Sequence, residues 1–182
     1  MLILNEDEIR QLVSTTEAID AVEAGFAALA HGKVSLPGVI NFTLPSVHSP
    51  EAPKGESHVK GAYIAGALHF VIKVANSFPD NRALGLPVGS GLMLAFDAIS
   101  GLLDAILLDN GYLTELRTGA AGAVATRYLA PSTIQRVAFI GAGTQARFQF
   151  RAIAAVRDVS SVSIWSRNPV SADAFAREMV DD

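Results

Sequence analysis

The sequence of 182 residues contains no cysteine. Disulfide bonds and thiolate metal sites are therefore excluded, and we expect neither a metal centre nor an oxidising compartment. Basic residues are also few, because 14 Lys and Arg residues against 18 Asp and Glu residues give a formal net charge of −4. This balance argues against a nucleic-acid-binding protein.

Long apolar runs are missing as well. No run reaches the length of a transmembrane helix, and the first eight residues lack the basic region and the long apolar stretch of a signal peptide. We therefore expect a cytoplasmic protein that does not enter a membrane. Hydrophobic residues make up 50% of the chain and charged residues 18%, so the chain can bury a globular core.

A glycine-rich turn is the most informative motif that the sequence does contain. Residues 137–140 are apolar and predict a buried strand, and an apolar pattern at helical spacing begins at residue 145. Between them, a Gly-x-Gly-x-x-Ala pattern allows a sharp turn and lets a pyrophosphate approach the backbone. The free N–H groups of the first helical turn can hold its phosphates. The predicted cofactor-binding residues here are Gly141, Ala142, Gly143, Thr144 and Gln145.

A second predicted strand, at residues 161–166, completes a β-α-β unit and favours a dinucleotide site over a purely structural glycine turn. This strand ends in Ser166-Arg167-Asn168, without the acidic residue that usually binds the ribose 2′-hydroxyl of NAD. Arg167 can pair with a 2′-phosphate and Ser166 can hydrogen-bond it. NADP(H) is therefore the favoured cofactor. NAD(H) is the alternative, in which Arg167 is a solvated surface residue.

The earlier part of the chain predicts a mixed domain. Capping patterns that begin at Asn5 and Ser14 predict two helices. Five strands of a mostly antiparallel sheet and a later helix follow, with a polar, proline-rich loop at 45–55. The predicted strands are 36–44, 58–64, 68–75, 91–96 and 102–108, and the helix is 114–130.

Pro131 ends that helix and marks the expected domain boundary. We expect the α/β fold class, with an α+β substrate-binding and dimerisation domain at 1–130. It is joined to the start of a Rossmann doubly wound parallel sheet at 131–182. Such a sheet needs five or six strands and only two fit after residue 137, so we expect a truncated piece of a longer protein, inactive by itself.

Two cations are candidates for chemistry. Lys73 lies in an apolar strand, where an unpaired ammonium is costly to bury. It is either an edge-strand residue that reaches water or a site residue. Arg117 is expected in the first turn of a helix, an unfavourable place for a cation. It forms either a surface salt bridge to Glu115 or Asp109, or an anion site together with the helix N-terminus.

Several motifs in chain order resemble the ornithine cyclodeaminase/mu-crystallin family. They are Val71 to Asn76 with Pro79 and Asn81, Gly85-Leu86-Pro87, Phe96-Asp97 with Gly101, Leu113 to Ala121, Ala125 to Pro131, and the glycine-rich turn. The resemblance implies a substrate and dimerisation domain before a Rossmann domain, and a homodimer. It implies that Lys73 and Arg117 are catalytic, bind a small α-amino or α-imino acid, and meet across a cleft opposite the phosphate loop. It also implies substrate contacts from Asn76 and cofactor contacts from Arg117 and Thr118.

The implied activity is an NAD(P)H-dependent oxidoreductase acting on the C=N or C–N bond of such an acid. Two alternatives stay open: a cyclodeaminase-type lyase that recycles NAD internally, and a mu-crystallin-like protein that holds NADPH and a small ligand. Family members acting on ornithine carry an arginine in the strand near residues 36–42. This chain has no arginine there, which argues against ornithine as the substrate. The segment with His58 and Lys60 resembles the branches that reduce imines or dehydrogenate amino acids, in which both residues can add substrate contacts. For His58, a plain strand residue is the favoured alternative.

Overall fold

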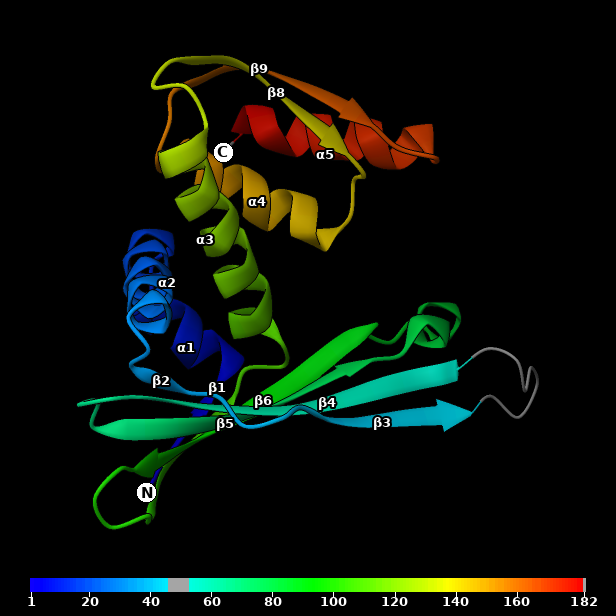
Figure 1. Cartoon of the computed structure of the whole chain (residues 1–182). Helices are drawn as coiled ribbons and strands as arrows, with labels where there is room; N and C mark the ends of the chain where they lie inside the picture. The colour runs from blue at the N-terminus through cyan, green and yellow to red at the C-terminus, as the bar shows by residue number, and fades with distance from the viewer. Residues whose placement is uncertain (46–52, 182) are drawn as a thin grey trace. The chain divides into compact units, whose positions relative to one another are not determined.

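The computed structural model describes residues 1–45 and 53–181. The chain forms two compact units, each continuous in space but not in sequence (Figure 1). The first contains Met1–Leu12 and Gly25–Thr114, and the second contains Val13–Ala24 and Glu115–Asp182. The expected domain boundary at Pro131 stays a prediction, because a compact unit need not be an independently folding domain.

The first unit is built on a sheet with the strand order β1-β7-β6-β5-β4-β2, in which β3 also pairs with β4. All pairings are antiparallel except that of β1 with β7. The strands are β1 Leu2–Asn5, β2 Val34–Ser35, β3 Ile40–Pro45, β4 Pro53–Ile64, β5 His69–Ser77, β6 Gly89–Asp97 and β7 Leu103–Leu108. The predicted antiparallel sheet is therefore confirmed.

Three details of that sheet differ from the prediction. The strand expected at 36–44 begins only at Ile40, because Pro37 and Gly38 disfavour a regular ladder. Most of the loop predicted at 45–55 lies outside the described residues, while Pro53 to Gly55 belong to β4. The short strand β1 was not expected, since its parallel partner β7 lies about a hundred residues later in the chain.

Helices begin where the capping patterns place them. Asn5 and Glu8 exchange backbone and side-chain hydrogen bonds at the start of α1 Glu6–Leu12. Ser14 and Glu17 do the same before α2 Thr15–Ala30. These reciprocal bonds satisfy N–H groups that a helix leaves free at its N-terminus.

The second unit contains the predicted β-α-β unit. β8 Ile134–Ile140 pairs in parallel with β9 Val159–Trp165, and α4 Thr144–Ala154 connects them. α3 Tyr112–Leu129 precedes this unit and α5 Pro169–Asp181 follows it. The ring of Phe139 on β8 makes edge-to-face contacts with Phe150 on α4 and with Phe175 on α5, so both helices pack on the same face of the strand pair (Figure 1).

Candidate functional site

The phosphate loop, residues 141–145, joins β8 to α4. Gly141 has φ +117°, a conformation that only glycine adopts readily, and its N–H donates to the carbonyl of Trp165 at 2.7 Å. This bond holds the carboxyl ends of β8 and β9 together. A Cβ at Gly143, the N-cap of α4, would meet no atom within 4 Å. Free N–H groups with open space before them fit a bound pyrophosphate.

Ser166 and Arg167 follow β9 at the same edge of the strand pair. The Ser166 hydroxyl accepts the N–H of Asn168 at 3.4 Å, and the Asn168 side chain accepts the N–H of Val170 at 3.0 Å at the start of α5. Arg167 is exposed and forms no ion pair with any residue that the structure describes. Its guanidinium is therefore available to a ligand beside the phosphate loop.

Helices α3 and α4 approach closely because α3 carries glycine at the contact. A Cβ at Gly119 would lie 2.6 Å from the backbone oxygen of Phe148. Gly122 faces the side chain of Gln149, whose amide donates to the carbonyl of Thr118 at 3.0 Å. The contact brings the turn that holds Thr118 alongside α4.

Arg117 lies on α3 as an exposed residue. The helix begins at Tyr112 rather than at the predicted residue 114, so Arg117 is in its second turn. The alternative of a salt bridge between Arg117 and Glu115 is wrong, because the Glu115 carboxylate is bonded to the side-chain amide of Gln145. Among the described residues of the second unit, no acidic group forms an ion pair with Arg117. The alternative of a salt bridge to Asp109, which belongs to the first unit, stays a prediction.

Gln145 links the first turns of α3 and α4. Its amide nitrogen donates to the Glu115 carboxylate and lies 3.3 Å from the Glu115 carbonyl. Its amide oxygen is buried and has no hydrogen-bond partner among the described residues. A buried acceptor without a partner is costly, and a ligand donor at the loop would satisfy it.

Lys73 lies on the central strand β5, between β4 and β6. The edge-strand alternative is therefore wrong. The Lys73 ammonium donates to the hydroxyl of Thr114 at 3.3 Å in a partly buried setting. A hydroxyl carries no charge, so this hydrogen bond does not itself neutralise the ammonium, and an ammonium at a partly buried position can recognise an anion.

Strand register decides which residues share the face of Lys73. Lys60 on β4 lies directly opposite Lys73, and His58 lies opposite Ala75. Because directly opposed residues point to the same side of a sheet, Lys60 and His58 share that face. We call Lys73, Lys60 and His58 the cationic face. Asn76 points to the other side by strand alternation and donates to the Ser90 hydroxyl at 3.3 Å.

His58 has two polar neighbours on its own side of the sheet. One ring nitrogen lies 2.6 Å from the amide oxygen of Asn41 on β3, and the other lies 3.4 Å from the Glu56 carboxylate. Both contacts are compatible with a plain strand residue as well as with a site residue. The part of His58 in substrate binding stays a prediction, as do the roles of Lys73, Arg117, Asn76 and Thr118.

Lys73 and Arg117 belong to different compact units. Their expected approach across a cleft therefore stays a prediction. Within each unit, the structure brings together the residues of the cationic face, and separately those of the phosphate loop with α3. It does not bring Asn76 onto the cationic face.

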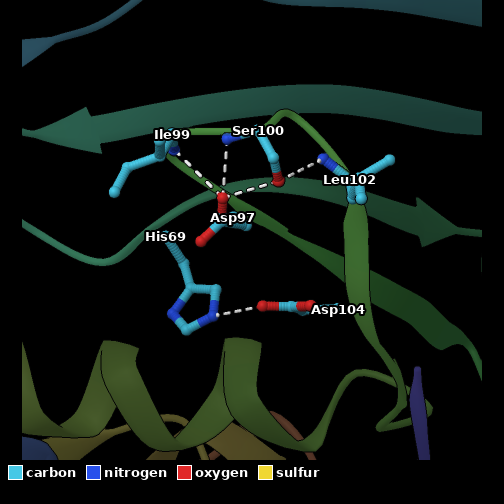
Figure 2. Close-up of polar contacts among 6 residues, drawn as sticks. All are labelled: His69, Asp97, Ile99, Ser100, Leu102 and Asp104. Atoms are coloured by element: carbon cyan, nitrogen blue, oxygen red, sulfur yellow. Dashed lines mark hydrogen bonds and ion pairs between the residues drawn. The ribbon is translucent and has the colours of Figure 1, made fainter.

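The Phe96-Asp97 motif closes the β6–β7 hairpin (Figure 2). One Asp97 carboxylate oxygen accepts the hydroxyl and N–H of Ser100, both at 2.6 Å, and the N–H of Ile99 at 3.2 Å. These bonds, led by the Ser100 hydroxyl, lower the pKa of Asp97. His69 points instead to Asp104, 3.0 Å away. This motif holds a turn in shape, as an Asx turn does.

Sequence reasoning missed Asp109 as a structural residue. It is 1% exposed, and its carboxylate accepts the N–H of Leu113 at 2.9 Å, which caps the start of α3. The sequence signal for this cap is the position of Asp109 directly before the Asn110-Gly111 turn. Both turn residues have positive φ.

The model of the ornithine cyclodeaminase/mu-crystallin family matches residues 1–181. The chain belongs to this family. A protein of Rhizobium meliloti (strain 1021), provisionally named a dehydrogenase, is 42% identical over 177 residues, which is 97% of this chain and 52% of that protein. The chain thus spans about half the length of the curated relatives it matches.

Solved structures show the same likeness to family members. The Delta(1)-pyrroline-2-carboxylate reductase of Thermococcus litoralis, in complex with NADH and L-proline, is 32% identical with a TM-score of 0.87, over 100% of this chain and 54% of that chain. An archaeal alanine dehydrogenase dimer with bound NAD is 33% identical with a TM-score of 0.86, over 100% and 53%. Among the helices of the described residues, none has the length and apolar character needed to cross a bilayer.

Proposed function

We propose that the protein at its natural length is a cytoplasmic NAD(P)H-dependent oxidoreductase. It acts on the C=N or C–N bond of a small α-imino or α-amino acid. The observation that carries the proposal is the cationic face, in which Lys73 sits partly buried on a central strand opposite Lys60. The phosphate loop in the same chain supports a dinucleotide. The names of the matched reductase and dehydrogenases agree with this chemistry.

The residues have distinct proposed roles. Lys73 and Arg117 bind and orient the substrate carboxylate, since two cations suit one anion in a site with little water. Lys73 or His58 transfers the proton that accompanies reduction. The dinucleotide, when bound, supplies or accepts the hydride, and the protein contributes position and charge.

An assay of the protein at its natural length tests the proposal. Keto acids with amines, cyclic imino acids and diamino acids are each supplied with NADPH and NADH, and the absorbance of the reduced nicotinamide is followed. A net change in absorbance with one of these substrates supports the oxidoreductase. Substrate loss with ammonia release and no net change identifies the cyclodeaminase alternative. Nucleotide binding without turnover of any substrate identifies the mu-crystallin-like alternative.

NADP(H) is the proposed cofactor because Arg167 is exposed and unpaired among the described residues beside the phosphate loop. Replacing Arg167 by Ala should lower kcat/KM for NADPH by about 10- to 100-fold, the worth of charge-assisted hydrogen bonds. The value for NADH should change little, and Arg167→Lys should keep part of the NADPH activity. Equal effects on both nucleotides, or on neither, would instead point to NAD(H).

We also propose a homodimer whose interface includes the side of β3 that carries Ile40 and Phe42. Ile40 and Phe42 alternate along this strand and are 57% and 54% exposed, on the side opposite to Asn41 and His58. Neighbouring exposed apolar side chains on an edge strand are typical of an interface. The dimeric state of the archaeal alanine dehydrogenase agrees with this.

Phe42→Ser is expected to weaken the dimer by at least tenfold, because a buried aromatic side chain contributes well over the 1.4 kcal/mol of a tenfold change. Sedimentation velocity across a dilution series measures the effect. Thr43→Ala, on the other side of the same strand, is the matched control and should leave the mass unchanged. A Phe42→Ser protein that stays dimeric at every dilution places the interface elsewhere.

A further inference from the structure

Arg147 occupies an unexpected place in the first turns of α4. A cation there opposes the positive end of the helix dipole, so other contacts must hold it. The structure gives it two sets of partners, one on α5 and one in the phosphate loop. The Arg147 side chain is 24% exposed and that of its partner Glu178 is 44% exposed, so the pair lies at the surface with the arginine partly covered.

The partners on α5 fix the position of the guanidinium. Glu178 binds it through both carboxylate oxygens, one of them 2.7 Å from Nη2. The wholly buried ring of Phe175, three residues earlier, lies with its centroid 5.1 Å from the guanidinium carbon. The pKa of Glu178 is lowered, chiefly by its hydrogen bond from Arg147, so the pair is charged on both sides at neutral pH.

The partners in the loop are two consecutive carbonyl groups. Nη1 of Arg147 donates to the oxygen of Ala142 at 3.0 Å and to that of Gly143 at 3.2 Å. In a trans peptide the C=O and N–H point in opposite directions. Drawing these two carbonyls toward Arg147 therefore turns the N–H groups of Gly143 and Thr144 away from it, toward the open side of the loop.

We propose that Arg147 is the positioning residue of the phosphate loop, holding it to Glu178 so that the N–H groups of Gly143 and Thr144 are set in advance for a dinucleotide pyrophosphate. The inference rests on the proposed cofactor. Only an arginine can perform this task, because its planar fork reaches two carbonyls and a carboxylate at once, whereas a lysine presents a point charge.

Three variants separate positioning from charge: Arg147→Lys, Glu178→Gln and, as control, Arg136→Ala at an exposed position of β8. In the protein at its natural length, Arg147→Lys should raise the Kd for both NADPH and NADH by about tenfold, close to one hydrogen bond to a charged group. The value of kcat at saturating nucleotide should stay unchanged. Glu178→Gln should show a smaller rise in Kd, and the double variant should be no worse than Arg147→Lys. Arg136→Ala should bind both nucleotides normally.

A second measurement does not depend on the cofactor. In amide NMR spectra of the protein at its natural length without nucleotide, Arg147→Lys should shift the Gly143 and Thr144 signals, and Arg136→Ala should not. Unchanged signals, or unchanged Kd values in a protein that binds nucleotide, overturn the inference. If the signals shift but the parent protein binds neither NADPH nor NADH, Arg147 does position the phosphate loop and the proposed function is wrong.

Discussion

Lys73→Ala is expected to lower kcat/KM by about 10²- to 10⁴-fold, the range of a residue that orients the substrate and transfers a proton. The ammonium of Lys73 is partly buried on the central strand β5 and donates to the hydroxyl of Thr114. Removing it takes away one of the two cations proposed to bind the substrate carboxylate, and with it a proposed proton donor. The loss should appear in kcat as well as in KM, because the proton role acts in the transition state.

Two further variants interpret this result. Lys73→Met keeps the apolar stem of the side chain and should be as inactive as Lys73→Ala, which excludes a packing defect as the cause. Lys60→Ala removes the cation directly opposite Lys73 on β4. It should lower kcat/KM by only about tenfold, since Lys60 is exposed. Steady-state kinetics with the best substrate of the assay panel measures all three. A Lys73→Ala protein with normal kcat/KM would remove the basis of the proposed chemistry.

Gly119→Ala is expected to destabilise the second unit, although alanine is the better helix former. The exchange gains about 1 kcal/mol of helix propensity. Against this, the added Cβ would lie 2.6 Å from the oxygen and 2.8 Å from the carbon of the Phe148 carbonyl group, and a backbone cannot rotate away. Overpacking of this kind costs up to about 3 kcal/mol. The net loss of about 2 kcal/mol should lower the melting temperature by roughly 4–8 °C.

Gly122→Ala is the matched control, one turn along the same helix. Its Cβ would meet the end of the Gln149 side chain, which can swing aside at the cost of its bond to the Thr118 carbonyl. That bond contributes about 1 kcal/mol, close to the gain in helix propensity, so the effects should nearly cancel. Thermal unfolding followed by circular dichroism compares the two. Equal melting temperatures would show that α3 and α4 can move apart enough at Gly119 to accommodate a methyl group.

Local sequence was informative where structure depends on neighbours in the chain. The capping pairs at Asn5 and Ser14 form as expected, because each needs only residues three positions apart. The β-α-β unit with its glycine turn was also predictable, since Gly141 requires a positive φ and the apolar periods of strand and helix differ.

The candidate site was only partly predictable. Lys73 stood out as a cation in an apolar strand, yet its place between β4 and β6 depends on pairings across the sheet. Arg147 gave no signal of its own, because Glu178, its partner, lies 31 residues away on α5. The family pattern places Asn76 at the substrate, but strand alternation sets it on the other face of the sheet from Lys73.

The sequence by itself determined the family, the starts of α1 and α2 and the phosphate loop, because spacing, glycine and proline act over a few residues. Tertiary structure alone decided which side chains share a face and which cations have partners. The opposition of Lys60 to Lys73, the pairing of Arg147 with Glu178 and the close contact at Gly119 each join residues distant in sequence. Strand register and helix packing set these contacts, and both are established only when the whole chain buries its apolar surface.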